Sequence, residues 1–163
     1  MKTKLFISAI CFFTGVCFSA CDKDDKGDVT PPVIKLAEPE EGDELLIGGE
    51  HGVHLEMDLY DDVALESYKI EIHNNFDHHG HDGKTKAAGE TVPFSFNKVY
   101  DDAKGLKNHH VHNHDIVIPA NATPGDYHLM IYCTDAAKNE SRTWRNIKLS
   151  TTAKPHEHEH EHQ

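Results

Sequence analysis

Histidine is the residue type that points most clearly to chemistry in this sequence, because most of its 15 histidines occur in short runs. The runs place imidazoles beside carboxylates, a ligand pair that suits borderline divalent cations. We therefore expect a bound transition-metal ion, with Zn²⁺ as the first choice and Ni²⁺ or Cu²⁺ as alternatives. The runs are Asp77–Asp82, with His78, His79 and His81; His109–Asp115, with His110, His112 and His114; and the tail histidines His156, His158, His160 and His162.

The elements that must position these histidines are β-strands, because apolar and polar residues alternate with a period of two. The alternation is clearest in the segments 53–60, 68–72 and 127–133, and turn-forming residues separate these segments. Tyr127 stands where the tyrosine corner of an immunoglobulin domain would lie. The pattern predicts an all-β fold, an immunoglobulin-like antiparallel β-sandwich of about seven strands.

The first predicted metal site lies where the expected strands 65–76 and 127–134 run side by side in one sheet. His73 is late in the first strand and His128 is early in the second, and both are out of phase with the core residues. They should therefore form an outward-facing cross-strand pair, with Cβ atoms about 5 Å apart. The loop that follows adds Asp77, His78, His79 and His81 as further ligands.

The second predicted site consists of His112 and His114, which share one strand face with His110 if the strand is regular. That same face would also carry Ile116 and Ile118, which belong in a core. Either a bulge near Asn113 switches the faces, or the histidines lie beyond the edge of the core. The sequence leaves open whether the two predicted sites are separate or form one composite site.

The tail forms a third, secondary metal-binding element, in which His156, His158, His160 and His162 alternate with glutamates. Such a flexible anionic chain is suited to catching cations without holding one in a fixed geometry. The alternation is also typical of an engineered purification tag, which would have no biological role.

A different class of function is a calcium-stiffened adhesion or scaffold module. Asp61 and Asp62 follow one strand, and Asp135 and Asn139 frame the turn after another, so all four are expected at the pole opposite His73. The segment Asp135-Ala-Ala-Lys-Asn139 resembles a turn of many bacterial immunoglobulin-like domains, with Lys138 in place of glycine. Oxygen ligands of this kind suit Ca²⁺, although turn formation alone explains the same residues.

The ends of the chain are expected to lie outside the sandwich. Residues 1–20 form a signal peptide with two early lysines and an apolar run, and the residues before Cys21 resemble a lipobox. Cys21 would be lipidated, 21–32 would be an acidic tether, 33–149 the folded domain and 150–163 a disordered tail. The chain would then be an outer-membrane lipoprotein of the cell envelope, with surface display as one alternative. Cys133 would remain as the lone thiol, buried in a strand.

Charge and motifs exclude several other functions. A formal net charge of −12 excludes nucleic acid as a main partner. The sequence contains no Gly-x-Ser-x-Gly, and the His-Glu-x-x-His spacing occurs only within the alternating His/Glu tail, where no helix is expected, so we expect no enzyme, with metal-assisted hydrolysis as an alternative. His110-Val-His112 resembles a strand of copper/zinc superoxide dismutase, but the disulfide of that family is absent. We expect a role in metal buffering or in handover to a transporter or surface partner.

Several motifs resemble an uncharacterised family of His-rich bacterial lipoproteins. They are Ser67–Asp77, His112–Pro119, Pro124–His128 and Tyr132–Ala137. The resemblance extends from about Pro32 to Leu149, nearly the whole expected domain. It implies an immunoglobulin-like domain in a lipoprotein and implies no activity.

Overall fold

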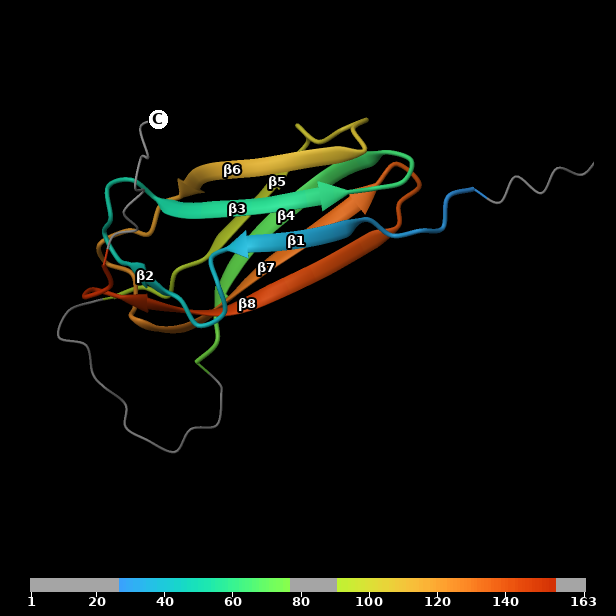
Figure 1. Ribbon diagram of the computed structural model, residues 1–163. Coiled ribbons are helices and arrows are strands. Elements are labelled where there is room, and N and C mark those ends of the chain that lie inside the picture. Colours follow the sequence, from blue (N-terminus) through green and yellow to red (C-terminus); the bar gives the residue numbers. More distant parts are fainter. Residues whose placement is uncertain (1–26, 77–90, 155–163) are drawn as a thin grey trace, which may run out of the picture.

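The computed structural model describes residues 27–76 and 91–154, in which all regular structure is β-strand (Figure 1). One sheet has the strand order β1-β3-β6 and the other has the order β2-β8-β7-β4-β5. The strands are β1 (Val33–Glu38), β2 (Glu44–Leu46), β3 (Val53–Tyr60), β4 (Leu65–Asn74), β5 (Phe96–Tyr100), β6 (Asn108–Ile116), β7 (Gly125–Asp135) and β8 (Glu140–Ser150). The described residues include no helix long and apolar enough to cross a membrane. The predicted all-β, immunoglobulin-like sandwich is confirmed, with eight strands.

The core lies between the two sheets, and it is built from the residues that alternate along each strand. In β3, Leu55, Met57 and Leu59 are at most 1 % exposed, while the residues between them are half-buried on the outer face. The central strand β7 buries every second residue from Tyr127 to Cys133 in the same way. Burying one large apolar side chain contributes about 1.5–3 kcal/mol, so this alternation fixes which face of each strand turns inward.

Tyr127 forms the predicted tyrosine corner at the start of β7. Its hydroxyl donates a hydrogen bond to the carbonyl oxygen of Thr123 (2.8 Å) and accepts one from the backbone N–H of Phe94 (3.1 Å). The ring is fully buried, so the two bonds satisfy a polar group that could not reach water. The corner joins the 91–95 segment to the start of β7.

Strand β2 lies, like β1, in a segment for which the sequence pattern did not predict a strand. It has three residues and pairs with β8 in parallel, whereas every other strand pair is antiparallel. Because β1 belongs to the three-stranded sheet, the chain changes sheets between Glu38 and Glu44. The segment 38–52, which contains β2, then leads to the start of β3 (Figure 1).

The antiparallel pairing places His54, His114 and the His73–His128 pair toward one pole of the sandwich and the loop aspartates at the other. The β3–β4 loop and the β7–β8 turn meet at one pole, where the amide of Ala136 donates to the carbonyl oxygen of Ala64 (2.9 Å). The start of β3, the end of β6 and the start of β7 lie at the other pole (Figure 1).

Candidate metal centre

Three histidines from two neighbouring strands converge on the outer face of the three-stranded sheet. His54 lies at the start of β3, and His112 and His114 lie near the end of β6. One candidate ligand nitrogen from each ring lies within 4.8 Å of the other two. The ring centroids are 4.9 Å apart for His54 and His112, 5.2 Å for His54 and His114, and 5.5 Å for His112 and His114. We call these three residues the histidine triad.

A β-bulge in β6 places the triad and the core on opposite faces. His112 pairs with Glu56 and Asn113 with Leu55, but the next pair is Ile116 with Val53. Two steps along β3 therefore match three along β6, so the extra residue falls at His114–Asp115. The bulge leaves His112 and His114 outside and turns Ile116 into the core, where it is 0 % exposed. The first of the two alternatives for this strand is thus confirmed.

Gly52 is required where the chain enters β3 beside this bulge. Its φ is +72°, in the left-handed region that glycine adopts without steric cost. A Cβ atom at this position would overlap the backbone carbonyl oxygen of His114 and lie 3.2 Å from that of Ile116. The close approach of the two backbones therefore holds the bulge against the segment before β3.

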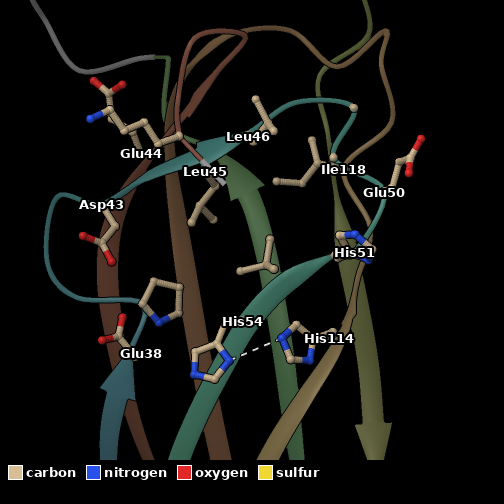
Figure 2. A pocket seen from close by; sticks show the side chains of 16 residues that line it. Glu38, Asp43, Glu44, Leu45, Leu46, Glu50, His51, His54, His114 and Ile118 are labelled. Atoms are coloured by element: carbon tan, nitrogen blue, oxygen red, sulfur yellow. Dashed lines mark hydrogen bonds between the residues drawn. The ribbon is translucent and has the colours of Figure 1, made fainter. Parts of the chain in front are cut away.

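The triad adjoins an acidic pocket of about 540 Å³, and residues of the segment 38–52 form most of the lining of this pocket (Figure 2). His54 and His114 both line it, and the His54 side chain is only 8 % exposed. Four residues of the lining carry carboxylates and one carries an ammonium group: Glu38, Asp43, Glu44 and Glu50, and Lys154. Glu56 adds a further carboxylate, 3.5 Å from Nε2 of His54. This surrounding negative charge favours a bound cation.

The triad has the ligand number of an open zinc site, and one of its nitrogen pairs has the spacing. Two nitrogens at about 2.05 Å from a tetrahedral Zn²⁺ are about 3.3 Å apart. Nδ1 of His54 and Nε2 of His114 are 3.4 Å apart, at the distance of a ring-to-ring hydrogen bond (Figure 2). Three protein ligands would leave a fourth coordination position for water or a ligand.

His73 and His128 face each other directly across β4 and β7, as the sequence predicts. Their ring centroids are 5.5 Å apart and the rings are nearly perpendicular. Nε2 of His128 lies 2.8 Å from the side-chain amide nitrogen of Asn75, and Nδ1 of His73 lies 3.3 Å from a carboxylate oxygen of Glu71. The predicted loop ligands Asp77, His78, His79 and His81 lie outside the described residues, so metal binding at this pair stays a prediction.

The two predicted histidine sites occupy different faces of the sandwich. His73 and His128 alternate with core residues of the five-stranded sheet, whereas His112 and His114 alternate with core residues of the three-stranded sheet. The core therefore separates them, and within the described residues they are two separate places. The tail histidines and Cys21 lie outside the described residues.

His54 is the ligand candidate that sequence reasoning missed. Its out-of-phase position in strand 53–60 is visible in the sequence, but the strand facing it lies some 60 residues later. His109 and His110 take other partners. Nε2 of His109 is 3.4 Å from Asp102, and Nδ1 of His110 is 2.9 Å from Asp58, a hydrogen bond that lowers the pKa of the Asp58 carboxyl.

Aspartates also cluster at the opposite pole, but the cluster differs from the predicted set because it includes Asp28 and lacks Asp62. Carboxylate oxygens of Asp61 and Asp135 lie within 4.8 Å of one another and of Asp28, which precedes β1. Asp62 is exposed and is not part of this group. Asn139 donates hydrogen bonds from its amide N–H to Oδ1 (2.8 Å) and from its side chain to Oδ2 (2.7 Å) of Asp135.

Comparison with known proteins gives a family and no activity. A family model described as "Domain of unknown function (DUF4625)" matches residues 19–150. No curated protein matches the chain. The predicted resemblance to an uncharacterised family is therefore confirmed, whereas the His-rich lipoprotein character of that family stays a prediction.

Proposed function

Because the chain belongs to the domain-of-unknown-function family DUF4625, whose description carries no activity, we propose its function from the geometry of the site. The protein binds a divalent transition-metal ion through His54, His112 and His114, with Zn²⁺ as the first choice and Ni²⁺ or Cu²⁺ as alternatives. The observation that carries this proposal is the convergence of three imidazoles from two rigid strands within 4.8 Å.

Two further features support an ion that is bound and also released. Three imidazoles leave one coordination position open, and the adjacent pocket of about 540 Å³ gives a second ligand room to reach it. An ion held in this way can be exchanged by ligand substitution, which suits buffering or handover to a transporter. In this proposal the protein is a lipoprotein, anchored through Cys21 in the outer membrane of the cell envelope, and it binds metal without catalysis.

Titration calorimetry with Zn²⁺, Ni²⁺ and Cu²⁺ on the full chain tests the proposal. The four tail histidines are replaced by alanine in every sample, so that the tail adds no imidazole ligands. His112→Ala and His114→Ala should each weaken Zn²⁺ binding at least about 100-fold, because even residues behind the ligands cost about 10–100-fold. The double variant should lose little more, since ligands of one ion are not additive.

His110→Ala is the matched control, because His110 is exposed on the same strand and lies outside the triad. It should bind Zn²⁺ like the parent chain. Affinity should also fall as the pH drops through about 6.5, where protons compete with metal for imidazole. Wild-type affinity in His112→Ala and His114→Ala, or an affinity that is flat between about pH 8 and pH 5, would refute the proposal.

A further inference from the structure

Three aspartates from distant parts of the chain meet at the pole opposite the histidine triad. Asp28 precedes β1, Asp61 follows β3 and Asp135 is the last residue of β7. The β1–β3 pairing, which begins at Val33 and Tyr60, brings the segment around Asp28 to the β3–β4 loop. The side-chain N–H of Asn139 donates to the backbone carbonyl oxygen of Asp28 (3.1 Å) and joins this segment to the β7–β8 turn.

Two of the three carboxylates are buried. Asp135 is 0 % exposed and Asp61 is 9 % exposed, and all three offer oxygens within 4.8 Å of one another. Within residues 27–76 and 91–154, no Lys, Arg or His nitrogen forms an ion pair with any of them. Like charges at such distances repel strongly in a site shielded from water.

One oxygen in this cluster has no partner. Oδ1 of Asp61 accepts hydrogen bonds from the amides of Val63 (2.9 Å) and Ala64 (2.6 Å), which fixes the carboxylate in the β3–β4 loop. Its Oδ2 is buried and makes no hydrogen bond. A buried carboxylate oxygen without a partner among the described residues is costly, so its position beside two other carboxylates points to a cation site.

We propose that Asp28, Asp61 and Asp135 bind a Ca²⁺ ion. Ca²⁺ takes about six to eight oxygen ligands in flexible geometry, and each of the three carboxylates offers one oxygen within 4.8 Å of the others, with water or a second carboxylate oxygen for the remainder. Mg²⁺ demands a stricter octahedron and usually keeps several waters, which fits a cluster with two buried carboxylates less well. Asn139 is a positioning residue that orients Asp135 through its two hydrogen bonds.

The ion would connect parts of the chain that the sheets leave apart. Asp28 belongs to the segment leading into β1, whereas Asp61 and Asp135 belong to loops of the folded pole. Calcium would therefore hold this entering segment against the sandwich and set the direction in which the domain projects from it. This site is independent of the histidine triad, which lies at the other pole.

Thermal unfolding of the full chain, first stripped with a chelator and then titrated with CaCl₂, tests the site. Saturating Ca²⁺ should raise the Tm of the wild type by about 5 °C or more. Asp61→Asn keeps the acceptor for the loop amides but removes a charge. Without Ca²⁺ this variant should melt at or above the wild-type temperature, because repulsion is relieved, and with Ca²⁺ it should show little shift.

Asp28→Asn should lose the calcium response as well, and Asp62→Asn, an exposed neighbour outside the cluster, should retain it. A chain carrying His112→Ala and His114→Ala should also retain it, which separates this site from the proposed transition-metal site. A wild type that ignores Ca²⁺, an equal shift in wild type and Asp61→Asn, or an equal shift with MgCl₂ would each overturn the proposal.

Discussion

Replacing Gly52 by alanine should destabilise the fold and distort the histidine triad together. Forcing an L-residue to a φ of +72° costs about 1–2 kcal/mol, and alanine recovers about 0.4–1 kcal/mol by stiffening the unfolded chain. The new Cβ would also overlap the carbonyl oxygen of His114, and overpacking of this kind costs about 1–3 kcal/mol. We therefore expect Gly52→Ala to lower the free energy of unfolding by about 1–4.5 kcal/mol.

Gly105→Ala is the matched control, because Gly105 has a similar φ of +78° and an added Cβ atom there would meet nothing within 4 Å. It should cost about 1 kcal/mol or less, so the difference between the two variants measures the backbone contact alone. Urea unfolding gives both values, and Zn²⁺ titration should show at least a tenfold weaker affinity for Gly52→Ala. Equal destabilisation of the two variants would refute the argument that Gly52 holds the bulge. Unchanged affinity in a destabilised Gly52→Ala would show that the bulge does not position His114 for metal.

Three further outcomes are expected. The double variant His73→Ala/His128→Ala should weaken Zn²⁺ binding at a second site, separate from the histidine triad. It should barely change the stability of the metal-free protein, because both side chains face outward. Calorimetry that resolves an unchanged second binding event would contradict this. Cys133 should stay unlabelled by a thiol reagent at pH 8 until denaturant unfolds the chain, because burial raises its pKa to about 12; rapid labelling of the native protein would count against it. Tyr127→Phe should lower the free energy of unfolding in urea by about 1–3 kcal/mol, because it leaves the N–H of Phe94 and the carbonyl oxygen of Thr123 without their hydrogen-bond partner. An unchanged stability would mean that water replaces the hydroxyl.

The sandwich and the His73–His128 pair were predictable because they follow from local alternation and strand order. Once the segment around His73 and the segment around His128 are neighbouring antiparallel strands, their phase relative to the core fixes which residues meet. The structure reproduces that register. Local pattern is sufficient here because no bulge interrupts β4 and β7 between this pair and Ser67.

The histidine triad and the aspartate cluster were not predictable in full, because both depend on contacts between distant segments. The meeting of His54 with His114 depends on the pairing of two distant strands and on a bulge in β6, and the sequence leaves open whether that bulge exists. Asp28 sits in a charged segment without periodicity, and its carbonyl contact with Asn139 spans 111 residues. Strand β2, with three residues, is too short for any period to be read.

The bulge in β6 gives this strand one residue more than a regular ladder against β3 would need. Deleting Asp115 would restore a regular ladder in which His114 lies opposite His54 and Ile116 opposite Val53, so His114 would stay outside and Ile116 would stay in the core. Deleting Asn113 would also restore a regular ladder, but it would place His114 opposite Leu55 and so turn it toward the core. The same loss of one residue should therefore preserve the triad at one position and abolish it two positions earlier. Substitutions at the outward positions leave the ladder intact, so the triad can be altered residue by residue.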